Sequence, residues 1–267
     1  IIYRVGVTSL KIEIRDTDPN TGKMVKVGDF IFDEFADEKI NEFASEHSTR
    51  FRVALAEGVS SWQVYKALSE IKFLLGKLEN IPDEGTIAPA SYDFVIGMTK
   101  EALIKTMQER QASILNEAWN ARQPNLPINT KQEALILASI IEKETSLKTE
   151  RGKVSSVFVN RLLREIALQT DASVVYGITR GKKVLGRGLR RSELKKDTPW
   201  NTYVNKGLPP SPIGNPGKAS IHAALNPDIT NYLYFVADGS GGHAFAENLR
   251  EHNINVAKWR KIEKTDN

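Results

Sequence analysis

Two acidic residues, Glu142 and Glu144, stand at the end of an apolar stretch, QEALILASIIEKETS (residues 132–146). If this stretch is a helix, each residue turns by about 100°, and Leu137, Ile140 and Glu144 share one face. Glu142 then points almost the opposite way. A carboxyl group on an apolar face near a helix C-terminus is costly to ionise, so its pKa should rise. A carboxyl still protonated near neutral pH suits general acid catalysis. The spacing alone leaves an alternative open, in which the stripe surfaces at its last turn and Glu144 is merely solvated.

Other kinds of catalytic chemistry have little support in the sequence. There is no cysteine, which excludes disulfides and thiolate chemistry. The four histidines, His47, His222, His243 and His252, are scattered and form no HExxH pair. The nucleotide-binding patterns GxxxxGK[ST] and GxGxxG and the GxSxG nucleophile pattern are also absent. We therefore expect a chemistry that rests on carboxylates, without a metal or cofactor.

The composition is that of a globular protein with a mild basic bias. The chain has 267 residues, a formal net charge of +4 and a pI of about 9.1. This balance suits an anionic polymer or a membrane surface as readily as nucleic acid. Residues 179–191 are basic and glycine-rich, and they form either a solvated loop or a strip that meets a negatively charged polymer.

The chain shows neither a signal peptide nor an apolar run of the roughly 18 residues that a membrane span needs. It begins with Ile1 rather than Met, so we expect it to be a fragment of a longer protein, with any anchor upstream.

Alternation of apolar and polar residues predicts strands near the N-terminus, together with short helices. The proline- and glycine-containing stretch Asn80–Pro89 is the clearest break in composition and predicts a domain boundary near residue 85. The predicted strands are Tyr3–Ile14 (one or two strands), Met24–Phe32 and Phe51–Leu55, and the predicted helices are Asp37–Glu46 and one capped by Ser60 or Ser61 that runs to Leu68.

Helical periodicity dominates the rest of the chain, which ends in a hairpin and a closing helix. Leu168–Val175 reads as a looser segment, and Trp200–Gly217 as an irregular one whose aromatic and amide side chains suit a sugar-binding groove. The predicted helices are Thr99–Arg122, Gln132–Ser146, Glu150–Arg164, Ser220–Leu225 and Glu247–Lys261, with a turn at Asp238–Gly242 between two strands.

Five blocks of this sequence resemble one family closely. They are LASIIEKET (137–145), VSSVFVNRL (154–162), LQTDASVVYG (168–177), NTYVNKGLPPSPIGNPG (201–217) and YLYFVADGSGGHAF (232–245). In this order they resemble the MltG/YceG family of endolytic murein transglycosylases. EGTIAPASYDF (84–94) is similar to the family's EGxxxPDTYxF segment, with Ala90-Ser91 where Asp-Thr is usual. The first fifty residues resemble the family only loosely.

The resemblance implies an α+β fold in two parts. A small N-terminal α+β, LysM-like subdomain (residues 1–85) would precede a mainly helical, lysozyme-like catalytic domain (residues 86–267) with a β-hairpin near the C-terminus. It also implies cleavage of the β-1,4 bond between N-acetylmuramic acid and N-acetylglucosamine in peptidoglycan, leaving a 1,6-anhydro-muramyl end. The family's catalytic glutamate corresponds to Glu144, with Glu142 as the competing assignment. The residues expected to line the cleft are Glu142, Gln169, Asp171, Asn201, Tyr203 and Asn215.

The resemblance also implies partners and a location. Peptidoglycan strands are the substrate, peptidoglycan synthases the neighbours, and the biological role is to limit the length of nascent strands. A single-pass anchor outside this chain would hold the domains on the periplasmic side of the inner (cytoplasmic) membrane.

Three alternatives stay open from the sequence. The first is a non-catalytic peptidoglycan-binding module. The second is a muramidase that uses water, with Asp171 as the more suitable second carboxylate because Glu142 points away on the helix. Nucleic-acid binding through residues 180–191 is the weakest, since no stacking pattern accompanies the charge.

Overall fold

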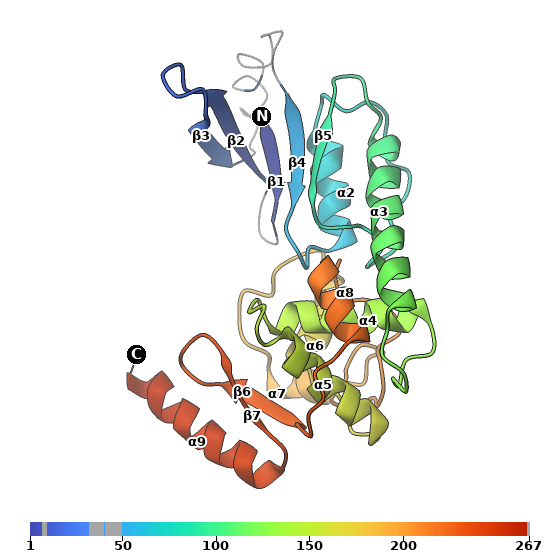
Figure 1. Cartoon of the computed structure of the whole chain (residues 1–267), viewed down its shortest axis with the longest axis vertical. Helices are drawn as coiled ribbons and strands as arrows, with labels where there is room; N and C mark the ends of the chain where they lie inside the picture. Colours follow the sequence, from blue (N-terminus) through green and yellow to red (C-terminus); the bar gives the residue numbers. More distant parts are fainter. Residues whose placement is uncertain (7–9, 32–39, 41–49, 266–267) are drawn as a thin grey trace.

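The N-terminal part of the computed structural model is a mixed sheet with two helices against it (Figure 1). Residues 1–6, 10–31, 40 and 50–265 are described here. Within those residues the sheet has five strands in the order β3-β2-β1-β4-β5, and β1 pairs with β4 in parallel while the other pairs are antiparallel. The strands are β1 (Ile2–Val5), β2 (Leu10–Thr17), β3 (Met24–Ile31), β4 (Phe51–Leu55) and β5 (Ser91–Phe94).

This sheet buries its apolar side chains against α2 (Ser61–Glu70) and the first half of α3 (Lys100–Asn120). The side chain of Ser60 caps α2 by accepting from the backbone N–H of Gln63, as the sequence predicts. Leu68 of α2 and Met107 of α3 are fully buried in this first core. The same α3 helix then contributes Leu115 to a second core, so it joins the two parts of the molecule.

The second core is built around α4 (Lys131–Glu144), whose residues 134–141 are all buried. The periodicity predicts a helix with one apolar face, but neighbours surround this helix for two turns. Its neighbours include α5 (Arg151–Leu163), α6 (Asp171–Thr179) and α8 (Lys218–Leu225). The short helix α7 (Arg191–Lys195) lies in the long loop between α6 and α8. Apart from the buried Ser139, the polar residues of α4 lie at its ends, and Glu144 is its last residue.

A hairpin and a helix complete the chain at the lower left of Figure 1. β6 (Tyr234–Ala237) pairs with β7 (His243–Ala246), and α9 (Leu249–Thr265) packs along β6. The predicted hairpin, its turn and the closing helix are therefore confirmed.

The α+β class is confirmed, and most predicted elements are present within a few residues. Two differences concern Asp171–Thr179, predicted as part of a looser segment but helical, and Ser91–Phe94, an unpredicted strand. The predicted helix over Asp37–Glu46 falls, except for Ile40, outside the described residues. The boundary near residue 85 stays a prediction. β5 and the first half of α3, which follow that residue, belong to the first core. No helix in the described ranges has the length and apolarity to span a membrane.

The two parts meet at a set of hydrogen bonds centred on Asn215, which is fully buried. Its backbone exchanges bonds with residues 58 and 59, Gly58 N to Asn215 O at 2.9 Å and Asn215 N to Val59 O at 2.8 Å. Its side chain donates to Val59 O (3.0 Å) and accepts from Ile87 N (2.9 Å). This one side chain therefore satisfies backbone groups that a buried junction would otherwise leave unpaired.

We predict that Asn215→Ala destabilises the protein by about 2–3 kcal/mol, because it leaves the Ile87 N–H and one bond of Val59 unsatisfied in a buried position. Urea unfolding followed by circular dichroism measures this. The matched control is Asn116→Ala on the exposed side of α3, which should change stability by under about 0.5 kcal/mol. Equal effects of the two substitutions would contradict the role given to Asn215.

Candidate active site

Three consecutive residues at the end of α4 point to three different places. Glu142 accepts a hydrogen bond from Gly217 N (2.9 Å) and lies 3.7 Å from the guanidinium of the buried Arg151. Lys143 donates to Gly58 O at 2.6 Å. Glu144 faces a cavity on the other side of the helix. The two acids are thus separated by the helix, as their spacing predicts.

Glu144 lies at the wall of a cavity of about 220 Å³. The helix ends there because the next residue, Thr145, is extended, with φ −146° and ψ 133°. The apolar part of the wall includes Phe158 of α5 and Phe235 of β6, whose rings meet edge to face with centroids 5.9 Å apart. The full lining is Glu144, Phe158, Arg161, Leu168, Gln169, Thr170, Asp171, Tyr203 and Phe235.

Burial raises the pKa of Glu144, because the apolar wall disfavours its charged form. The hydroxyl of Thr170 donates to Glu144 Oε1 and opposes this shift by stabilising the carboxylate. The negative charge of Asp171 raises the pKa further, and the charge of His243 lowers it. With burial as the largest cause, Glu144 keeps its proton to a higher pH than an ordinary glutamate, which a general acid requires.

Asp171 occupies the first position of α6, where the helix dipole favours a negative charge. The hydroxyl of Tyr203 donates to Asp171 Oδ1 at 2.7 Å. Burial, together with this carboxylate, raises the pKa of Tyr203, so the phenol stays protonated and acts as a donor. Gln169, two residues before Asp171, has φ +54°, a left-handed conformation that costs a residue with a side chain about 1–2 kcal/mol.

Arg161, a buried residue of the same lining, holds together the segments around the cavity. Its Nε donates to Leu233 O (2.7 Å) and its Nη1 to Leu168 O (2.9 Å). Burial lowers the pKa of Arg161. The guanidinium therefore ties the residue before β6 to the segment that carries Gln169 and Thr170.

Glu150 anchors the hairpin to the segment that follows Glu144. It accepts from the backbone N–H of His243 (2.9 Å), and its other oxygen lies 2.8 Å from the ring Nδ1 of the same residue. The His243 ring meets Phe235 edge-on, with centroids 5.2 Å apart. The hairpin wall of the cavity is thus held by residues 144–150.

The structure brings four of the predicted site residues to one cavity, namely Glu144, Gln169, Asp171 and Tyr203. The other three, Glu142, Asn201 and Asn215, are not among its lining residues. The Asn201 amide donates to the carbonyls of Leu194 (3.0 Å) and Lys196 (2.8 Å) and so closes the loop before it.

The residues that the sequence did not single out are Thr170, Arg161 and the pair of His243 and Glu150. Of these, only Thr170 could have been predicted from the sequence, because it stands between two predicted site residues. In the described part of the chain, no three histidine or carboxylate side chains converge on a metal position.

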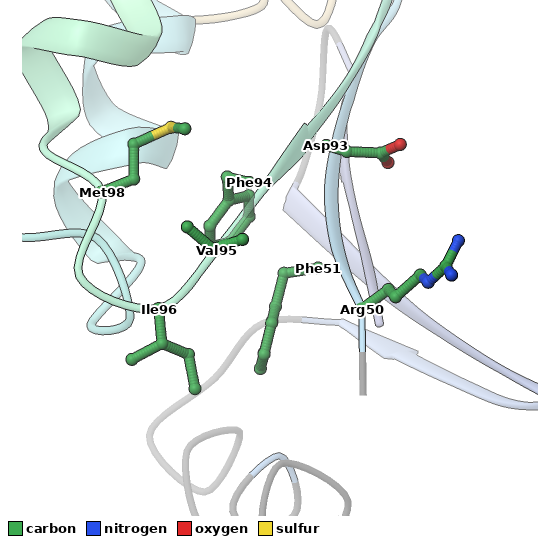
Figure 2. Close-up of a pocket in the computed structure, with 7 residues that line it drawn as sticks. All are labelled: Arg50, Phe51, Asp93, Phe94, Val95, Ile96 and Met98. Carbon is green, nitrogen blue, oxygen red and sulfur yellow. The ribbon is translucent and has the colours of Figure 1, made fainter. Parts of the chain in front are cut away.

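A larger hollow, of about 480 Å³, lies at the edge of the N-terminal sheet (Figure 2). Its lining is mostly apolar, with Phe51, Phe94 and Ile96. Asp93 points away from these side chains in Figure 2 and pairs with Arg52 at 2.6 Å. Among the described residues that line this hollow, Asp93 is the one acid, and its carboxylate is paired in this way.

The model of the YceG-like family matches residues 7–258 of this chain. The chain is similar to the endolytic murein transglycosylase of Bacillus subtilis strain 168, with 40% identity over 180 residues, which cover 67% of this chain and 48% of the relative. It is 34% identical over 182 residues to the endolytic murein transglycosylase of Streptococcus pneumoniae strain D39, covering 66% of this chain and 32% of the relative. The match therefore spans about half of one curated relative and a third of the other.

A solved structure has a similar fold. The crystal structure of a YceG-like protein from Listeria monocytogenes superposes with a TM-score of 0.66 at 26% sequence identity. The superposition covers 85% of this chain and 83% of that one.

We predict that Thr170→Val raises the pKa of Glu144 above its value in the wild-type chain, because the carboxylate loses its hydroxyl donor while remaining buried. A ¹³C carboxyl NMR titration measures this, and the signal lost in Glu144→Gln assigns the resonance. Thr106→Val on the exposed side of α3 is the control and should leave the titration unchanged. A lowered or unaltered pKa in Thr170→Val would refute the contact.

Proposed function

This chain belongs to the YceG-like family, and from that membership and its cavity we propose that it is an endolytic murein transglycosylase. The substrate is the glycan strand of peptidoglycan. The reaction breaks the β-1,4 bond between N-acetylmuramic acid and N-acetylglucosamine and leaves a 1,6-anhydro-muramyl end. The observation that carries the proposal is the partly buried carboxyl of Glu144, with a raised pKa, at a cavity lined by polar side chains.

The mechanism needs one acid used twice. Protonated Glu144 gives its proton to the glycosidic oxygen as the bond to the muramyl C1 breaks, which frees the 4-hydroxyl of N-acetylglucosamine. The resulting carboxylate takes the proton of the muramyl 6-hydroxyl as that oxygen bonds to C1. Atoms balance without water, and Glu144 ends protonated again. Activity should fall as the pH rises through the pKa of Glu144, because the first step consumes the protonated form.

Thr170 and Tyr203 support this cycle. The Thr170 hydroxyl stabilises the carboxylate that exists between the two steps, so burial does not make the intermediate state too costly. Tyr203 and Asp171 form one hydrogen-bonded pair at the wall, which presents polar groups to sugar hydroxyl and amide groups. Gln169 stands beside them with an amide that can both donate and accept.

We predict that Glu144→Gln lowers release of anhydro-muropeptides by at least about 100-fold, since an amide cannot donate the proton. Digestion of purified peptidoglycan, with products read by mass spectrometry, measures this. Glu142→Gln is the matched control and should keep most of the activity, because Glu142 lies on the other side of α4.

The product mass also separates this reaction from hydrolysis. A 1,6-anhydro end is one water lighter than a reducing end. Products with reducing ends would contradict the proposal and indicate a muramidase that uses water. Binding without any cleavage would indicate a wall-binding module. If Glu142→Gln loses activity and Glu144→Gln does not, the general acid is Glu142 rather than Glu144.

The finer features of the whole protein are part of the same proposal. The N-terminal α+β unit is LysM-like, a single-pass anchor holds the protein in the inner (cytoplasmic) membrane, and the enzyme works beside peptidoglycan synthases to limit strand length. The proposed location is supported by the proposed substrate, because peptidoglycan strands are assembled on the extracytoplasmic side.

We predict that protease added outside intact spheroplasts digests this part of the full-length protein. A cytoplasmic protein followed in the same sample is the control and should stay intact. Protection of both proteins would contradict the proposed side of the membrane.

A further inference from the structure

A second groove, of about 400 Å³, lies where α2 meets the loop that follows α6. Trp62, Gln63 and Lys66 line it from α2, and Lys182 and Lys183 line it from the loop. In Figure 1 this loop passes below the lower ends of the sheet and of α2. The groove is therefore shared between the two parts of the molecule and is separate from the cavity of Glu144.

The loop that carries the two lysines is fixed at its beginning. Gly181 O accepts from the Ser60 hydroxyl at 2.7 Å. A Cβ on Gly181 would lie 2.4 Å from Ser60 Cβ, and its φ is +67°, so this close approach requires glycine. One residue earlier, the guanidinium of Arg180 lies 3.5 Å from the centroid of the Trp200 ring. These contacts fix the backbone just before Lys182 and Lys183, so the two lysines start from a defined position beside α2.

The groove carries an excess of positive charge beside an aromatic ring. Lys66, Lys182 and Lys183 are exposed, and Glu70, the one acid among the described lining residues, lies 3.9 Å from Lys66. The Lys66 ammonium is 5.6 Å from the centroid of the Trp62 ring. Two ammonium groups on the loop thus face a ring and an amide, which suits a ligand that combines carboxylates with less polar groups.

α6 sets the separation between this groove and the cavity. Its N-terminal residues, Thr170 and Asp171, line the cavity, and the loop after its C-terminus lines the groove. With 9 residues, α6 is about 14 Å long at 1.5 Å per residue. In the arrangement proposed below, one polymer strand occupies the cavity and presents a substituent to the groove.

We propose that this groove binds the carboxylate-bearing peptide stem of a peptidoglycan strand whose glycan lies at Glu144. The proposal rests on the proposed function, from which it takes the polymer. Charge favours the stem over the glycan itself, since the N-acetylated sugars are neutral and the muramyl carboxyl is consumed in the bond to the stem. Free carboxylates occur along the stem, and these complement Lys182 and Lys183.

The test measures binding by the whole chain carrying Glu144→Gln, so that the polymer stays uncut. Cosedimentation is compared between intact peptidoglycan, freed of other anionic wall polymers, and the same material after an amidase has removed the stems and the muramyl carboxylates that it frees have been converted to amides. Adding Lys182→Gln and Lys183→Gln should weaken binding to the intact polymer roughly three- to tenfold, as expected for two solvent-accessible ion pairs. Binding to the stem-free glycan should not change.

The matched control removes the same charge elsewhere, with Lys258→Gln and Lys261→Gln on the exposed side of α9, and should bind both polymers as the parent does. Unchanged binding to intact peptidoglycan, or an equal loss for both polymers, would overturn the stem assignment. Equal loss of binding to single-stranded DNA would indicate an unspecific polyanion strip and overturn it too.

A separate digestion with the active chain distinguishes the two proposals. If anhydro ends are released but binding does not depend on the stems, the proposed function is kept and the stem-binding role of the groove is rejected. If binding depends on the stems but no anhydro ends are released, the groove keeps its role and the proposed function is rejected.

Discussion

The burial of α4 on all sides is the constraint on which the rest of this structure depends. Residues 134–141 are all buried, and their one polar side chain, Ser139, is hydrogen-bonded inside the core, so the helix can offer polar groups to a cavity only where it ends. There Glu142, Lys143 and Glu144 each meet a different part of the chain. A helix of this kind fixes the acid to a rigid support, since any movement of Glu144 would have to move a close-packed core.

The two residues before Glu144 help to connect it to the N-terminal part. Glu142 binds Gly217 N and Lys143 binds Gly58 O, while Asn215 joins residues 58 and 59 to Ile87. The loop between β4 and α2 is therefore attached to α4 directly through Lys143, one residue before Glu144, and the segment that carries Asn215 and Gly217 is attached through Glu142. Because these bonds are largely to backbone groups, they fix the relative position of the two parts without depending on which side chains the N-terminal unit carries.

The sequence predicted Glu144 because the apolar residues of this stretch recur with a helical period, which places Glu144 on the same face. It could not separate the amides of Asn201 and Asn215 from sugar-binding residues, because both uses favour the same side chain in an irregular segment. What decides between them is a partner far away in sequence, such as Val59, which is 156 residues from Asn215. The contacts of Thr170, Arg161 and His243 depend on long-range packing in the same way. Strand β5 was missed because four residues give too short an alternation to recognise.

The partly buried acid and the polymeric substrate that we propose would place opposite demands on one site. The acid needs a low-polarity wall to keep its proton, whereas a glycan offers mostly hydroxyl and amide groups that need polar partners. The cavity divides these demands between its sides, with Phe158 and Phe235 on α5 and the hairpin, and Gln169, Asp171 and Tyr203 at the start of α6 and the following loop. Thr170 stands where the two sides meet and contacts the acid directly. α6 thus serves twice: its first turn carries the polar wall of the cavity, and its length sets how far from the acid the positive charge of Lys182 and Lys183 begins.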